Sequence, residues 1–130
     1  MYLLDTNTII YFFKGLGNVA EKLLSKSPQE IAIPSITLYE LEVGIAKSNN
    51  PQKRKQQLNS FLSYIEVFSF TSKEAKAAAS IRAQLEKIGT PIGVYDTLIA
   101  GIALSSNSTL VTHNTKEFKS VQNLTIEDWF

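Results

Sequence analysis

Met1-Tyr2-Leu3-Leu4-Asp5-Thr6-Asn7 opens the chain with the pattern of a buried strand. Three apolar residues run without a polar break into Asp5, which is typical of a parallel-sheet strand ending at a turn. Ligands of open α/β sheets bind beyond the carboxyl ends of the strands, so Asp5 is placed where a ligand would bind. Asn7 is predicted to cap a helix over residues 8–13.

Outward from this stretch, short apolar runs alternate with helical patterns along the whole chain. Such alternation predicts a three-layer α/β/α domain with a central parallel sheet of four or five strands. No linker or repeat divides the sequence, so residues 1–130 are predicted to form one domain. The further strands are expected at 31–33, 65–70, 109–112 and, at an edge, 124–126. The further helices are expected at 19–27, 37–47, 50–62, 71–89, 96–106 and 114–118.

Composition narrows the chemistry that the chain can support. Thirteen basic and twelve acidic residues give a formal charge of +1, which neither indicates nor excludes nucleic-acid binding. The chain has no cysteine and one histidine, which excludes disulfides, thiolate metal sites and multi-histidine zinc sites. A metal would therefore be held by oxygen, as Mg²⁺ or Mn²⁺ prefers. No membrane-length apolar run or signal peptide is evident, so a soluble cytoplasmic protein is expected.

Four acidic residues occupy corresponding places in this pattern: Asp5, Glu40, Asp96 and Glu117. Each one alone is explained by a turn or a helix cap. Together they follow strands or begin helices, and these positions coincide at one edge of a parallel sheet. Four carboxylates in one place would repel one another unless a divalent cation bound between them. Such a site supports phosphodiester hydrolysis, because a metal activates water and neutralises phosphate charge.

Glu42 competes with Glu40 for the second of these positions. The two lie about 200° apart around a helix, so both cannot face one pocket. Thr37 and Glu40 have the spacing of a capping box, which predicts that the helix begins at Thr37. Glu40 is chosen because it is nearer the helix start.

On four segments the sequence resembles the PIN-domain ribonucleases, specifically the VapC-type toxins of bacterial toxin–antitoxin pairs. The segments occur in the family's order and span nearly the full length. They are Leu3-Leu4-Asp5-Thr6-Asn7; Thr37-Leu38-Tyr39-Glu40-Leu41 with Gly44; the run from Pro91 to Gly101; and the run from Leu110 to Phe118, followed by Leu124 and Glu127-Asp128-Trp129.

The resemblance implies a Mg²⁺-dependent endoribonuclease, with Mn²⁺ as an alternative cofactor. Asp5 and Asp96 correspond to the principal metal ligands, and Glu40 corresponds to the family's second acidic residue. Glu117 matches the fourth acidic position of one subgroup, whereas many relatives have an aspartate where this chain has Asn114.

Three polar residues, Asn7, Thr112 and Asn114, are expected to orient the ligands. His113 follows the fourth strand and is expected to lie at the surface or to support the site. Where relatives often have a histidine after Ala-Gly, this chain has Ile102, which puts substrate choice in question.

The resemblance also implies partners. The subgroup resembles toxins that cut tRNA, with the anticodon stem–loop of initiator tRNA as the expected substrate, and thereby inhibit translation. A VapB-type antitoxin is expected to wrap the chain and to contact operator DNA itself, and a homodimer is expected. The aromatic residues Tyr11, Phe12 and Phe13 are assigned to core packing in preference to a partner groove.

Two other functions are kept open. A phosphohydrolase would use Asp5 as its nucleophile, although such enzymes usually have an aspartate where this chain has Asn7. A non-catalytic RNA- or protein-binding module on the same fold is the other alternative. The densest basic cluster, Lys53-Arg54-Lys55, is assigned to a solvated helix face, with RNA phosphate binding as the alternative.

Overall fold

The computed structural model describes residues 1–130 and confirms the predicted α/β/α architecture. Five parallel strands form one sheet in the order β3-β2-β1-β4-β5. The strand that contains Leu3 and Leu4 lies at the centre of the sheet. The bounds are β1 Tyr2–Leu4, β2 Ile31–Pro34, β3 Glu66–Phe68, β4 Thr109–Val111 and β5 Ile126–Glu127.

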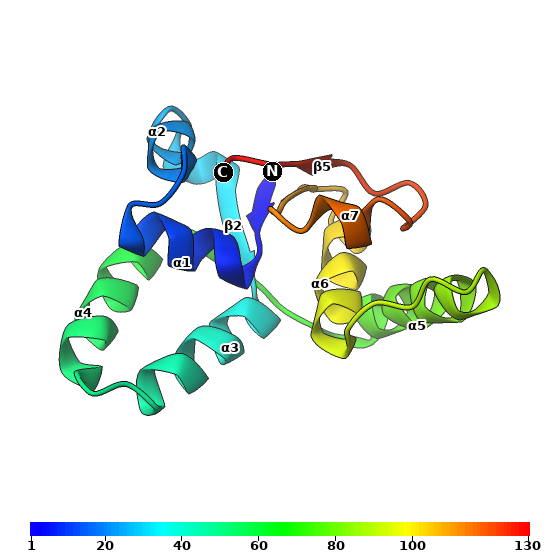
Figure 1. The fold of residues 1–130 in the computed structure, drawn as a ribbon, viewed down its shortest axis with the longest axis horizontal. Helices are drawn as coiled ribbons and strands as arrows, with labels where there is room; N and C mark the ends of the chain where they lie inside the picture. The colour runs from blue at the N-terminus through cyan, green and yellow to red at the C-terminus, as the bar shows by residue number, and fades with distance from the viewer.

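Helices cover both faces of this sheet (Figure 1). One face is covered by α5, α6 and α7, and the other by α1, α2, α3 and α4. A short 3₁₀ helix, η1, which was not predicted, precedes β2. The bounds are α1 Thr6–Lys14, α2 Val19–Leu24, η1 Pro28–Glu30, α3 Ser35–Ala46, α4 Pro51–Leu62, α5 Ser72–Lys87, α6 Val94–Ser105 and α7 Thr115–Phe118.

Neighbouring residues of β1 enter separate cores because side chains alternate across a strand. Leu3 packs with Leu110 in the core beneath α5 and α6. Leu4 packs with Val111 in the core beneath α1 to α4. Both leucines are fully buried, which explains why the strand reads as an unbroken apolar run.

The helix starts differ from the prediction in three places. Asp5, not Asn7, is the N-cap of α1, and its carboxylate accepts a hydrogen bond from the Thr8 backbone N–H. The α3 helix begins at Ser35, so the capping box predicted at Thr37 is wrong. The α6 helix begins at Val94, which places Asp96 in the first turn instead of at the cap.

Both ends of α5 agree with the range 71–89 that the sequence predicted. The Thr71 backbone N–H donates to the Glu74 carboxylate at 2.7 Å, closing the capping box that begins α5. Gly89 follows α5 with a φ of 78°, a left-handed conformation that glycine adopts without strain.

The last residues return to the body of the protein, and the two ends of the chain lie near each other (Figure 1). Trp129 is buried, and its ring lies 5.3 Å from that of Tyr2. The Phe130 carbonyl accepts a hydrogen bond from the Asn18 N–H, which ties this end to the segment between α1 and α2. None of the helices is both long and apolar enough to span a lipid bilayer.

Candidate active site

Asp5 lies between the end of β1 and the start of α1, as the topology predicted. It is 6% exposed, and its backbone N–H donates to the Val111 carbonyl of β4. Burial raises the pKa of the Asp5 carboxyl above its usual range, while hydrogen bonds from Thr112 and Thr8 oppose the shift. A buried carboxylate at the carboxyl end of the central strand is a chemically unusual group.

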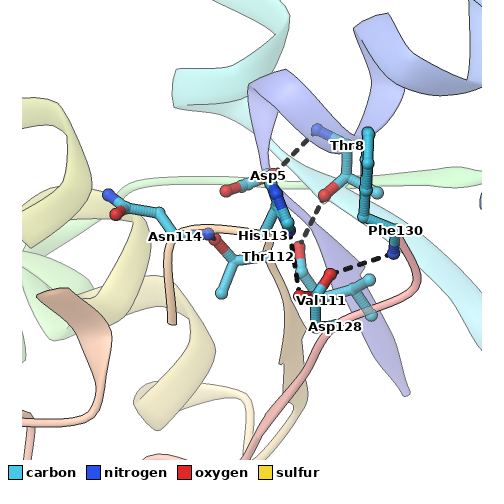
Figure 2. A network of polar contacts seen from close by, with 8 residues as sticks. All are labelled: Asp5, Thr8, Val111, Thr112, His113, Asn114, Asp128 and Phe130. Carbon is cyan, nitrogen blue, oxygen red and sulfur yellow. Dashed lines mark hydrogen bonds and ion pairs between the residues drawn. The ribbon is translucent and has the colours of Figure 1, made fainter. Parts of the chain in front are cut away.

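Thr112 and Asn114 follow β4 beside Asp5 (Figure 2). Thr112 is fully buried, and its hydroxyl accepts a hydrogen bond from the Asn114 backbone N–H at 3.0 Å. The same threonine supports the Asp5 carboxylate by hydrogen bonding. The loop after β4 is therefore fixed directly against this carboxylate.

Asp96 shows that the four predicted acids share one electrostatic environment. Its pKa is raised from 3.8 to about 6, first by burial and then by the negative charges of Asp5, Glu117 and Glu40. A hydrogen bond from the Asn114 side chain opposes this rise. The structure thus brings together side chains that are far apart in the sequence, at one end of the sheet.

Glu40 is held on α3 by a residue of α1. Its carboxylate accepts a hydrogen bond of 2.6 Å from the Thr6 hydroxyl, which also lies 3.4 Å from the Thr37 hydroxyl. The neighbours of Glu40 and Asp96, Tyr39 and Tyr95, have ring centroids 5.7 Å apart. These contacts join the beginnings of α1, α3 and α6 around the carboxylates.

Glu117 lies on α7, and its side chain is exposed. The Asn114 side-chain amide donates to the Glu117 carboxylate at 3.0 Å. Asn114 also hydrogen-bonds Asp96. One amide therefore links the third and fourth acidic residues, a role that the sequence position of Asn114 had only suggested.

The four acidic side chains offer carboxylate oxygens as ligands, and these suit a hard divalent cation. No three acidic side chains approach closely enough to hold a metal ion together. That spacing still fits Mg²⁺, which keeps several waters and binds through one or two protein carboxylates. Burial is the main cause of the raised pKa of Asp96, and the negative charges of the other three acids add a repulsion that a cation would relieve. The assignment of Asp5 and Asp96 as the ligands stays a prediction.

The sequence analysis missed two residues of this site. Thr6 was quoted as part of the opening stretch but given no role, although it is the partner of Glu40. Asp128 lies close enough to Asp5 to raise its pKa. The Asp128 carboxylate contacts His113 Nδ1 at 2.9 Å and accepts a hydrogen bond from the Phe130 N–H (Figure 2).

Other predicted residues lie further from the carboxylates. Asn7 is exposed, and its side chain makes no hydrogen bond, so its orienting role stays a prediction. Glu42 is exposed and lines a depression with Lys55 on a different side of α3 from Glu40. His113 is half-exposed and stacks on Phe130, with ring centroids 4.3 Å apart, which places it at the surface as expected.

Comparison with known proteins gives concordant results. The sequence matches the PIN domain family over residues 2–124. It is 39% identical to Ribonuclease VapC2 of Rickettsia felis, covering 99% of this chain and 98% of that protein. It is 37% identical to the tRNA(fMet)-specific endonuclease VapC of Salmonella typhimurium, covering 98% and 97% of the two chains.

Solved structures agree with these sequence relatives. The fold superposes with a TM-score of 0.92 on a chain of the crystal structure of VapBC2 from Rickettsia felis bound to a DNA fragment from their promoter. The two chains are 38% identical, and the match covers 99% of this chain and 98% of the other.

Proposed function

The chain belongs to the PIN domain family and is a VapC-type ribonuclease, and from this premise we propose that it is a metal-dependent toxin that cuts tRNA. The observation that carries the proposal is the placement of Asp5, Glu40, Asp96 and Glu117 at one end of the sheet, where the charges of the other three acids act on Asp96. We propose Asp5 and Asp96 as the metal ligands, and Glu40 and Glu117 as the supporting acids.

Each proposed acid has a partner that fixes its position. Thr8 and Thr112 hold Asp5, and Thr6 holds Glu40. Asn114 holds both Asp96 and Glu117. Mg²⁺ or Mn²⁺ bound here would activate water and neutralise charge on the scissile phosphate. The fixed carboxylates orient the reacting groups, because their positions are set before the substrate arrives.

The proposed substrate is tRNA, with the anticodon stem–loop of initiator tRNA as the first candidate. Support comes from the Salmonella relative, which is described as a tRNA(fMet)-specific endonuclease. Cleavage of initiator tRNA would inhibit translation, so the proposed location is the cytoplasm. The position that bears a histidine in many relatives is Ile102, which is 1% exposed and lies in the core beneath α6. It therefore cannot contact RNA in this chain.

The proposed partner is a VapB-type antitoxin that covers the site and contacts operator DNA through its own domain. Support comes from the superposition on a chain of the Rickettsia complex, which is described as VapBC2 bound to a promoter fragment. A homodimer of the chain is proposed from the family resemblance.

The test is incubation of the purified chain with bacterial tRNA, in Mg²⁺ and in EDTA, with both ends of every fragment mapped. Asp96→Asn is the test variant, and Glu42→Gln is the matched control on the opposite side of α3. We expect discrete cuts that require Mg²⁺, disappear in Asp96→Asn and persist in Glu42→Gln. Metal-independent cuts, or full activity of Asp96→Asn, would contradict the proposed metal site.

Two further outcomes decide between the functions that the sequence left open. Release of phosphate from a phosphomonoester would favour the phosphohydrolase. Tight RNA binding by the folded chain without cleavage in either Mg²⁺ or Mn²⁺ would favour the binding module.

A further inference from the structure

A groove of about 420 Å³ begins at Glu40 and runs between α1, α3 and α4. In Figure 1, α4 runs from near the end of α1 that is distant from the sheet to near the corresponding end of α3. Positive residues contribute to all three walls: Lys14 at the end of α1, Lys47 directly after α3, and Arg54 on α4.

These three cations have no acidic partner in the protein. The ion pairs of the chain are Arg82–Glu86 and His113–Asp128, at other places in the fold. The acidic residue of the groove wall is Glu40, whose carboxylate accepts its hydrogen bond from Thr6. The groove therefore concentrates positive charge in a chain whose formal net charge is only +1.

The structure divides the basic cluster on α4. Arg54 lines this groove, whereas Lys55 lines the separate depression that contains Glu42. Lys53 lines neither of them. Consecutive residues on a helix point about 100° apart, so the cluster does not form one face. Lys53 and Lys55 are thus natural controls for Arg54.

Gly44 leaves one position of the α3 groove wall without a side chain. It lies in the helix interior, where glycine is disfavoured, and a Cβ built on it would meet no atom within 4 Å. Packing within the chain therefore does not require glycine here. A bare backbone at this position allows an occupant of the groove to approach α3 closely.

We propose that this groove holds the sugar–phosphate backbone of the RNA on one side of the scissile bond. Lys14, Lys47 and Arg54 neutralise its phosphates, and Gly44 gives the strand room. The inference rests on the proposed function, because the groove wall includes Glu40, one of the proposed acids, whose charge acts on Asp96. That connection to the acidic site favours RNA over an acidic protein segment as the occupant.

The test compares Lys14→Gln, Lys47→Gln and Arg54→Gln with the controls Lys53→Gln and Lys55→Gln. kcat and KM for tRNA are measured over a range of monovalent salt at fixed Mg²⁺. Each groove variant should raise KM about threefold to tenfold at low salt and leave kcat unchanged. The slope of log KM against log salt should fall by about 0.7 for each phosphate that the variant no longer neutralises. The controls should match the wild type.

A second arm measures binding without cleavage. Anisotropy of a fluorescein-labelled anticodon stem–loop of initiator tRNA, in EDTA, gives Kd for the same variants. Groove variants should show the same reduction of affinity and of salt dependence as in the kinetic arm. Gly44→Leu should weaken binding while keeping the wild-type salt slope, because it adds bulk and removes no charge.

The outcomes separate this inference from the proposed function. If the wild type cleaves tRNA and the groove variants keep its KM and salt slope, the groove inference is wrong and the ribonuclease stands. If the wild type does not cleave, the proposed function fails, and the binding arm still decides whether the groove holds RNA. Unchanged RNA affinity in all groove variants, with reduced affinity for a polyglutamate peptide, would assign the groove to an acidic protein segment and overturn the inference.

Discussion

The Thr6 hydroxyl donates a hydrogen bond of 2.6 Å to the Glu40 carboxylate and so joins the first turn of α1 to α3. Glu40 has no other side-chain hydrogen-bond donor. The position of this acid therefore depends on a residue that follows Asp5 directly. Thr6 is a positioning residue, since it acts on the site through Glu40.

Replacing Thr6 with valine tests this relationship. Valine keeps the β-branched shape and removes the hydroxyl, so Glu40 loses its anchor while the packing stays similar. We expect kcat for RNA cleavage to fall roughly 10-fold, as is typical when a group that orients a metal-site ligand is removed. Thr6→Ser restores the hydroxyl and should restore most of the rate. A valine variant with the wild-type rate, or a serine variant as slow as valine, would contradict the positioning role.

Sequence reasoning located the acids because strand ends and helix starts of a parallel sheet meet at one edge. It could not assign the first helix cap, because Asp5 and Asn7 are both favoured N-cap residues and only backbone geometry separates them. It could not find the Thr6–Glu40 bond, which joins residues 34 positions apart. The separation of Arg54 from its basic neighbours also required the packed arrangement of α4 against α1 and α3.

The pKa of Asp96 predicts how stability depends on pH. Its folded-state pKa of about 6 lies above the usual 3.8, so the folded protein binds the proton more tightly than the unfolded chain. The charged carboxylate therefore destabilises the metal-free fold above pH 6, and this effect is relieved as pH falls from 6 to 4.

Asp96→Asn removes this effect. At pH 7.5 in EDTA we expect the variant to be more stable than the wild type by roughly 1 kcal/mol, less than the full shift implies because Asp96 is partly exposed. The difference should shrink toward zero near pH 4. Urea unfolding of both proteins across this range measures it. A difference that is constant with pH would show that ionisation of Asp96 is not its cause.

Two glycines in helix interiors are predicted to respond oppositely to alanine. A Cβ at Gly101 would lie 2.8 Å from the Ala78 Cβ and 3.0 Å from the Glu74 carbonyl oxygen, because α6 crosses α5 closely there. Gly101→Ala should destabilise the fold by about 1–3 kcal/mol. Gly44→Ala meets no atom and should stabilise it by about 0.5–1 kcal/mol. Urea midpoints measure both changes. A Gly44→Ala variant less stable than the wild type would contradict the prediction that alanine fits this position of α3.

Asp5 combines a structural role with the proposed chemical one, and two substitutions separate them. Asp5→Asn keeps an oxygen that can accept from the Thr8 N–H and removes the charge. Asp5→Ala removes both the charge and the cap. Each variant should reduce RNA cleavage by roughly 100-fold or more, because the proposed metal ligand is removed.

The stabilities of the two Asp5 variants should differ although their activities do not. Asp5→Ala should be about 1 kcal/mol less stable than Asp5→Asn, the usual contribution of an N-cap side chain. Thermal unfolding in EDTA gives this difference without interference from bound metal. Equal stabilities would show that the cap contributes little to α1. Cleavage by Asp5→Asn at the wild-type rate would instead show that Asp5 is not a metal ligand. Asp96 would then be the one proposed ligand that remains.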